Sequence, residues 1–176
     1  MATLSGIDIS HWNEALVKSS GYKWLATFDF VIMKATEGVN FTDKYLGSYI
    51  NMLYQGKTNP LYGFYHYARP ETGTTAESEA KHFLNTIGSH VGLAMFILDV
   101  EGEALKVKDL DTWVYKWAKT VYDITGVKPL IYCSESSCKK FKKACEFGCG
   151  LWCAKWSENK PKNIKPLYKK GGLDEG

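Results

Sequence analysis

An Asp-x-Glu pair, Asp99 and Glu101, directly follows the apolar run 94–98 and precedes a glycine. Such a run is typical of a buried strand, although a buried helical segment can show the same pattern. Side chains alternate between the faces of a strand, so the two carboxyls are expected to point the same way, about 6.5–7 Å apart. Neighbouring carboxyls raise each other's pKa because like charges resist joint ionisation. Acid–base cleavage of a glycosidic bond uses such a pair, whereas a solvated Asp-x-Glu in a loop would carry no chemistry.

Strand and helix patterns alternate along the chain. The strand candidates are 6–10, 28–35, 61–67, 94–99, 128–133 and 150–156. Helical patterns fill the intervals over 13–25, 43–56, 74–88, 109–126 and a shorter stretch that begins at 136 or 137. This alternation predicts a parallel sheet with right-handed crossovers, and six units favour a closed or nearly closed barrel over an open sheet.

A β/α barrel carries its chemistry at the C-terminal ends of its strands. Polar side chains stand at each of the predicted strand ends. They are Asp8, Ser10 and His11; Lys34 and Glu37; His66, Tyr67 and Arg69; Asp99 and Glu101; Tyr132 and Ser134; and Trp156. One carboxylate at a strand end is ordinary, but three of them ringed by aromatic residues predict a convergent acidic pocket.

The composition limits the classes of partner. The 176 residues carry a net charge of +3, with the basic residues concentrated in the second half. The cluster 139–143 is interpreted as a solvated helix face rather than a site for an anionic polymer. A single arginine, Arg69, argues against sequence-specific nucleic-acid binding. No apolar run is long enough to cross a membrane, and no GxGxxG or Walker pattern indicates a nucleotide.

All five cysteines lie between residues 133 and 153. Their number is odd and no C-x-x-C pair is present, so the spacing predicts no zinc site. We expect reduced thiols, with at least one unpaired if the protein meets an oxidising medium.

Five motifs occur in a recognisable order. They occupy residues 6–12 (GIDISHW), 30–38 (FVIMKATEG), 63–69 (GFYHYAR), 98–101 (LDVE) and 151–156 (LWCAKW). Together they resemble the glycoside hydrolase family 25 lysozymes, the muramidases of phages and bacteria, over about residues 4–156. The resemblance implies an α/β fold, a modified TIM-like (β/α)5(β)3 barrel with a groove at the C-terminal ends of the strands.

The resemblance also implies roles for particular residues. Glu101 resembles the general acid that protonates the leaving oxygen. Asp99 resembles the partner that stabilises positive charge on the sugar, and Asp8 resembles an auxiliary carboxylate on the groove floor. With Asp99 and Asp8 ionised, Glu101 is expected to hold its proton. Retention, inversion and attack by the substrate's own 2-acetamido group all stay open, because a spacing of two residues does not fix the carboxyl separation.

Substrate contacts are expected from residues around these carboxyls. Tyr65 and Tyr132 resemble the substrate-contacting tyrosines of the family, and Lys34 and Glu37 its groove-lining pair. The last two can equally form a structural ion pair. Trp156 is the better candidate for a sugar platform than Trp152, because it lies nearer the strand end. His66 is expected to pack rather than to perform chemistry.

The C-terminal part departs from the family pattern. The family's two closing strands are not recognisable after residue 156, so residues 1–156 are expected to form the catalytic barrel and residues 157–176 an atypical basic segment. The C-terminal barrel strands are then missing, altered or supplied by a partner.

The predicted function is a peptidoglycan hydrolase that cleaves the β-1,4 bond between N-acetylmuramic acid and N-acetylglucosamine. It is expected to need no cofactor and no metal, and to engage neither a membrane nor a nucleic acid. The N-terminus lacks a secretory signal, which favours a phage endolysin held in the host cytoplasm until lysis and then acting on the cell wall. A glycan-binding protein without turnover is the alternative, and a chitinase-like barrel is a third hypothesis.

Overall fold

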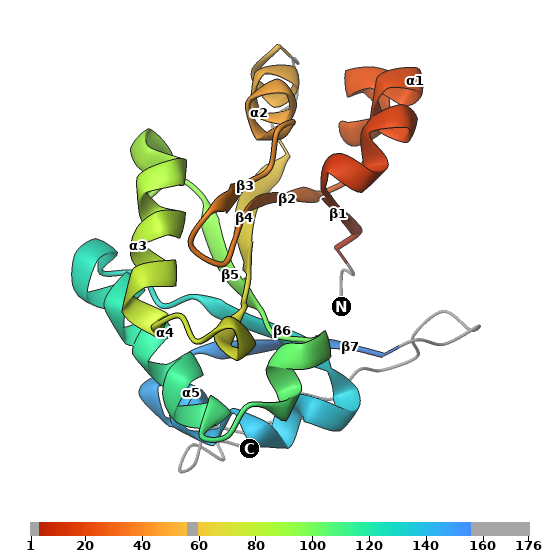
Figure 1. The fold of residues 1–176 in the computed structure, drawn as a ribbon. Coiled ribbons are helices and arrows are strands. Elements are labelled where there is room, and N and C mark those ends of the chain that lie inside the picture. Colours follow the sequence, from red (N-terminus) through yellow and green to blue (C-terminus); the bar gives the residue numbers. More distant parts are fainter. Residues whose placement is uncertain (1–3, 56–59, 156–176) are drawn as a thin grey trace.

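The computed structural model describes residues 4–55 and 60–155, and the chain forms a curled sheet with helices outside it (Figure 1). Six strands run parallel in the order β1-β2-β4-β5-β6-β7. Their bounds are β1 Gly6–Ile9, β2 Phe30–Glu37, β4 Leu61–Tyr67, β5 Met95–Asp99, β6 Leu130–Ser134 and β7 Gly150–Ala154. The short β3, Phe41–Thr42, pairs antiparallel with the end of β2. The mixed α/β fold with a curled parallel sheet confirms the predicted fold class.

Helical segments connect the parallel strands. The α-helices are α1 Glu14–Leu25, α2 Leu46–Tyr54, α3 Ala76–Ile87, α4 Leu110–Thr125 and α5 Lys142–Phe147. Shorter 3-10 segments are η1 His11–Asn13, η2 Pro70–Thr72, η3 Gly88–His90, η4 Gly102–Lys106 and η5 Glu135–Lys140. These connections satisfy the requirement that consecutive parallel strands be joined by a crossover.

The predicted elements agree with the observed ones to within a few residues at their ends. Thr75 caps α3, where its hydroxyl oxygen accepts a hydrogen bond from the backbone N–H of Ser78 at 3.1 Å. Gly126 ends α4 in the left-handed conformation with φ 72°. The sequence did not predict β3, because a two-residue strand has no periodic pattern.

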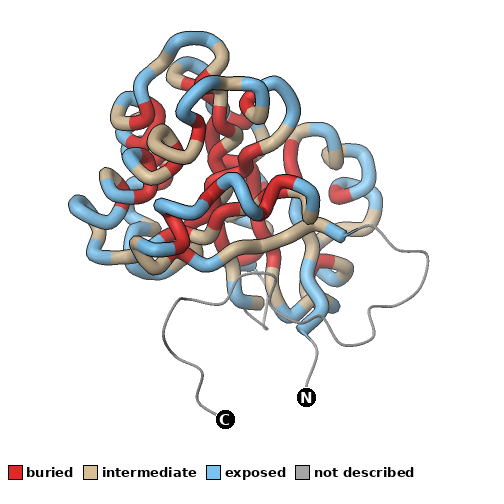
Figure 2. The backbone as a smooth tube through the Cα atoms, turned by 90° about the horizontal axis from the view of Figure 1, so that it is seen from below, coloured by how far each residue is buried: buried red, intermediate tan, exposed pale blue. Residues whose placement is uncertain are grey.

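The main core lies between the outer face of the sheet and the helices. Outward-facing strand residues such as Phe64 and Leu98 are fully buried there in one cluster with Phe83 of α3 and Trp117 of α4. Figure 2 shows buried positions concentrated along the strands, with exposed positions on the surrounding loops and helices. This packing fixes the positions of the strands, and therefore the positions of the side chains at their ends.

The inner face of the sheet is enclosed by its own curl. The rings of Phe30 on β2 and Trp152 on β7 meet edge to face, with centroids 6.4 Å apart. These two strands are not neighbours in the sheet, so this contact spans the inside of the curl. The curl brings the ends of β1, β5 and β6 around a common space.

The cysteines differ from the expectation of reduced thiols. Cys138 and Cys153 form a disulfide, with their Cα atoms 6.7 Å apart, whereas Cys133, Cys145 and Cys149 are free and buried. The pairing joins η5 to β7, a contact that only the folded crossover creates. Within the described residues, no helix is both long and apolar enough to span a membrane.

Candidate active site

The three predicted carboxylates converge on one pocket. Asp8 from β1, Asp99 at the end of β5 and Glu101 just beyond it line a pocket of about 120 Å³. The remaining lining residues come from β4, β5, β6 and β7, and they are Tyr65, Ile97, Tyr132 and Trp152. Segments more than 140 residues apart in the chain therefore contribute to one acidic, aromatic cavity, as the alternation of strands and helices predicts.

The local backbone explains how Asp99 and Glu101 reach the same pocket. The carbonyl of Asp99 accepts the backbone N–H of Ala68 at 3.0 Å, and the N–H of Val100 donates to the carbonyl of Tyr132 at 3.0 Å. The chain therefore stays extended past the last residue of β5, and side chains two apart share a side. Gly102 then turns the chain into η4 with φ 59°. A side chain there would be strained.

Burial makes the acidic pocket favour protonated carboxyls. Burial, with the nearby Glu101 charge, raises the pKa of Asp99 to about 8, while Lys34 opposes the shift. Burial and the Asp8 charge also raise the pKa of Glu101, and Lys34 again opposes. Burial raises the pKa of Asp8, although its side chain remains open to solvent. The expectation of an ionised Asp99 is therefore wrong for the ligand-free protein. Asp99 is buried, and burial disfavours its charged form.

Asp99 also has one buried oxygen without a hydrogen-bond partner among the described residues. Its side chain is only 9% exposed, and its Oδ1 atom is buried without a hydrogen-bond partner among the described residues. A buried oxygen without a partner costs free energy, on the order of 1–3 kcal/mol for a neutral group. A ligand that donates a hydrogen bond to this oxygen would remove that cost.

Aromatic side chains form the rest of the pocket wall. The rings of Tyr132 and Trp152 meet edge to face at 5.2 Å between centroids. Burial and the nearby carboxylates raise the pKa of Tyr132 to about 12 and shift that of Tyr65 upward as well. Both phenols therefore stay protonated and can donate hydrogen bonds. The predicted platform Trp156 lies outside the described residues. The sequence ranked Trp152 behind it, although the same alternation places Trp152 on the inner face.

Lys34 and Glu37 form the ion pair that the sequence allowed as an alternative. Lys34 Nζ lies 2.7 Å from Glu37 Oε2, and Arg69 pairs with both Glu37 and Glu71. Lys34 is buried beneath the rings of Phe41 and Tyr67, with Nζ 5.3 and 5.0 Å from their centroids. Neither Lys34 nor Glu37 lines the acidic pocket, but the charge of Lys34 acts on Asp99 and Glu101.

His66 packs in the core as expected. Its ring is fully buried and stacks on Trp117 at 5.7 Å between centroids. Nε2–H donates to Glu79 Oε2 at 2.7 Å, which leaves Nδ1 to accept the Thr36 hydroxyl at 2.7 Å. Both ring nitrogens are thus satisfied away from the acidic pocket.

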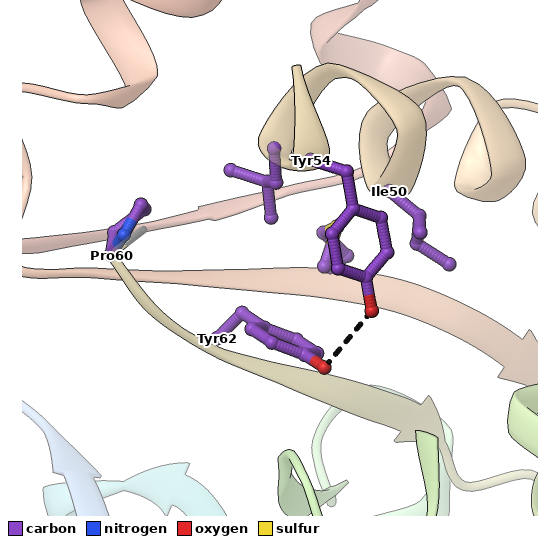
Figure 3. Close-up of a pocket in the computed structure, with 6 residues that line it drawn as sticks. Ile50, Tyr54, Pro60 and Tyr62 are labelled. Atoms are coloured by element: carbon purple, nitrogen blue, oxygen red, sulfur yellow. Dashed lines mark hydrogen bonds between the residues drawn. The ribbon is translucent and has the colours of Figure 1, made fainter. Parts of the chain in front are cut away.

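A second, smaller pocket is apolar and lies between α2 and the starts of the neighbouring strands (Figure 3). It measures about 50 Å³ and is lined by Met33, Ile50, Leu53, Tyr54, Pro60 and Tyr62. The hydroxyls of Tyr54 and Tyr62 face each other at 3.4 Å. No carboxylate or cationic side chain reaches this pocket from the described residues, so the acidic pocket is the candidate active site.

A curled parallel sheet with carboxyls gathered at its strand ends places the chain among β/α-barrel proteins with an acidic catalytic centre. A family model narrows this class: the model of the glycosyl hydrolases family 25 matches residues 7–172. The chain belongs to this family.

Curated relatives agree with this membership. The protein YegX of Escherichia coli K12, described as uncharacterized, is 34% identical over 138 residues, which cover 74% of this chain and 48% of YegX. An N,O-diacetylmuramidase of Arthroderma benhamiae is 30% identical over 172 residues, which cover 89% of this chain and 70% of that protein. The match thus spans about half the length of YegX.

Solved structures share the fold. A family 25 lysozyme from Aspergillus fumigatus superposes with a TM-score of 0.73 at 26% identity, covering 96% of this chain and 85% of that one. A bacterial lysozyme from Streptomyces coelicolor gives a TM-score of 0.72 at 22% identity, covering 97% and 82%. The second comparison establishes the fold alone.

Proposed function

We propose that this protein is a muramidase that hydrolyses the β-1,4 bond between N-acetylmuramic acid and N-acetylglucosamine in peptidoglycan. Family membership and relatives named lysozyme or N,O-diacetylmuramidase support the reaction class. The observation that carries the proposal is that the buried Asp99 lines the same pocket as Glu101. A glycan is the kind of ligand that combines hydrogen-bond donors with apolar faces suited to tyrosine and tryptophan walls.

Glu101 is proposed as the general acid. It lines the pocket and stays partly open to solvent, and burial with the Asp8 charge raises its pKa. A raised pKa is the direction that a general acid needs in order to transfer its proton to the leaving glycosidic oxygen. The carboxylate that remains can then activate the water that completes hydrolysis.

Asp99 is proposed to stabilise the positive charge that develops on the sugar. In the free protein its buried carboxyl holds a proton, because burial raises its pKa to about 8. An oxocarbenium-like transition state brings positive charge beside it, and this charge is stabilised by the carboxylate form, whose proton has been released to solvent before the bond breaks. The interaction is therefore stronger in the transition state than in the free protein, which is the requirement for catalysis.

The remaining contacts are proposed to bind and orient the glycan. Asp8 adds negative potential at the mouth of the pocket, and Tyr65 and Tyr132 offer phenolic hydroxyls inside it. Lys34 and Glu37 are proposed to act indirectly, as a charged pair behind the carboxyls. Trp152 stands in the pocket as an aromatic wall, while Trp156 stays a sequence prediction.

An endolysin role is the finer part of the proposal. The CTP1L endolysin superposes with a TM-score of 0.65 at 25% identity, covering 96% of this chain and 58% of that one. Expression in a bacterium with and without a pore-forming phage protein tests it. Lysis that depends on the pore supports the role, and lysis at the same rate without the pore contradicts it.

The reaction itself is tested with purified peptidoglycan. We expect turbidity loss and release of new reducing ends with wild-type protein, and at least a hundredfold slower release with Glu101→Gln, because amide cannot donate the proton. Glu103→Gln is the matched control, since Glu103 is exposed and pairs with Lys106 on η4. Retained activity in Glu101→Gln would contradict the assignment of the acid, and wall binding without reducing ends would indicate a glycan-binding protein.

A further inference from the structure

Three cysteines outside the acidic pocket gather on the outer side of the sheet. Cys133 on β6 and Cys153 on β7 are register partners, and Cys138 comes from η5, which follows β6. Their three sulfur atoms all lie within 4.8 Å of one another, and the Sγ atoms of Cys133 and Cys138 are 3.6 Å apart. Within residues 4–55 and 60–155, no other group of three or more potential metal ligands is as compact.

The three sulfurs differ in access to solvent. Cys133 is fully buried and Cys138 is nearly so, whereas Cys153 is partly exposed at the edge of the sheet. The cluster therefore has a closed side formed by protein and an open side at Cys153. A metal ion could enter from that side, and a water molecule could complete its coordination there.

The separation of the Cys133 and Cys138 sulfurs suits a tetrahedral metal–thiolate centre. Zinc–sulfur bonds of about 2.3 Å place two tetrahedral ligands roughly 3.8 Å apart, close to the separation of Cys133 and Cys138. In the disulfide form the Cys133 thiol contacts Cys138 Sγ but forms no covalent bond. We propose that Cys133, Cys138 and Cys153 together form a thiolate site for Zn²⁺, or for another soft divalent cation, when Cys138 and Cys153 are reduced.

The disulfide and the metal site exclude each other. In the reduction of the disulfide, a phosphine supplies two electrons and one water molecule supplies the oxygen and two protons, so the products are two thiols and the phosphine oxide. Binding of Zn²⁺ then displaces one proton from each of the three thiols, so that three thiolates and one water surround the ion. Zinc binding should thus release protons and protect the cluster from reoxidation.

Either state ties the edge strand to the preceding crossover. Cys153 directly follows Trp152, which lines the acidic pocket. Cys138 is anchored by η5, and its Sγ lies 3.5 Å from the carbonyl oxygen of Ser134. A metal at this position would hold β7 in place under reducing conditions, where the disulfide is lost.

Zinc binding to the reduced, full-length chain tests the proposal. After anaerobic reduction with a phosphine and removal of excess metal, we expect about one Zn²⁺ per chain by elemental analysis. Cys133→Ser removes one ligand but leaves the disulfide partners, and we expect at least tenfold weaker binding. Cys149→Ser is the matched control, because Cys149 is equally buried but outside the cluster.

Mass-spectrometric alkylation of the wild-type chain supplies a second measurement that needs no variant. Zinc should slow alkylation of Cys133, Cys138 and Cys153 in the partly denatured protein and leave Cys145 and Cys149 unprotected. Absence of stoichiometric zinc in the reduced wild type, equal protection of all five thiols, or equal affinity in Cys133→Ser would overturn the proposal. Because these readouts do not involve peptidoglycan, they are independent of the proposed reaction.

Discussion

Asp99, for which we propose a role in the reaction, is a buried side chain whose charge lowers the stability of the fold. Its carboxyl has a pKa of about 8 in the folded protein because burial disfavours the charge, against about 3.9 in an unfolded chain. Between these two values the folded state binds more protons than the unfolded state, so stability falls as pH rises through this window. Asp99 is therefore expected to reduce the stability of the folded protein at neutral and alkaline pH.

We expect Asp99→Asn to be more stable than wild type at pH 8, by on the order of a few kcal/mol, because the amide carries no charge to bury. The gain should shrink towards pH 4, where the wild-type carboxyl is neutral in both states. Urea unfolding followed by circular dichroism at several pH values measures this difference.

The exposed Asp123, which pairs with Lys119 on α4, provides the control for this measurement. Asp123→Asn should change stability by a few tenths of a kcal/mol, with no gain at high pH. A constant difference between Asp99→Asn and wild type across the pH range would contradict the assigned pKa of Asp99. Asp99→Asn, unlike Asp123→Asn, should also lose most of its hydrolytic activity.

Asp8 should shift the alkaline limit of activity through its effect on the pKa of Glu101. Its charge raises the pKa of Glu101, so Asp8→Asn should lower that pKa and move the alkaline limb of kcat/KM to lower pH. The shift should be modest, because Asp8 is open to solvent and its field is screened. A pH–rate profile of the residual activity measures it, and an unchanged or more alkaline limb would contradict the coupling.

At the scale of elements, one buried carboxylate joins α3 to the end of β4. Glu79 is fully buried on α3. It accepts hydrogen bonds from His66 Nε2 at 2.7 Å, from the backbone N–H of Arg69 at 3.1 Å and from the hydroxyl of Thr74. Burial lowers the pKa of His66, so the ring is neutral and donates one N–H to the charged carboxylate. This network fixes the chain where it leaves β4 beside Tyr65.

Glu79→Gln should destabilise the protein by about 1–3 kcal/mol, because charge-assisted acceptors are replaced by an amide that must also bury an N–H₂ group. Urea unfolding at pH 7 measures the loss. Glu77→Gln, two residues earlier on the same helix and only partly buried, should cost a few tenths of a kcal/mol through the helix dipole. Equal effects of the two substitutions would show that the buried network contributes nothing.

Sequence reasoning succeeded where local pattern determines structure. The apolar runs predicted the six parallel strands, since strands covered on both faces need continuous apolar residues. Side-chain alternation predicted that Asp99 and Glu101 share a pocket. Sequence reasoning failed for features that depend on how distant segments are placed against one another in the fold. The meeting of Cys133 and Cys153 depends on the β6–β7 register. The protonation of Asp99 depends on its depth in the folded protein.

At the scale of the whole molecule, the curl of the sheet depends on close packing inside it. Gly6 on β1 pairs with Phe30 on β2, and the Phe30 ring lies beside the exposed glycine. A Cβ atom at Gly6 would lie 2.0 Å from that ring, so the ring would have to move. The Phe30 ring also contacts the ring of Trp152 on β7. Trp152 in turn lines the acidic pocket. A single methyl group at Gly6 therefore acts on the contact that spans the curl.

We expect Gly6→Ala to lower the free energy of unfolding by about 1–3 kcal/mol through overpacking. It should also lower kcat/KM, because the displaced Phe30 ring disturbs Trp152. Gly47→Ala makes the same chemical change in the exposed part of α2, where a Cβ atom meets nothing within 4 Å. There alanine should stabilise the helix by about 0.5–1 kcal/mol and leave hydrolysis unchanged. Urea unfolding should therefore give opposite signs for the two substitutions, and reducing-end release should fall only for Gly6→Ala. A Gly6→Ala protein as stable and active as wild type would show that the curl does not depend on this contact.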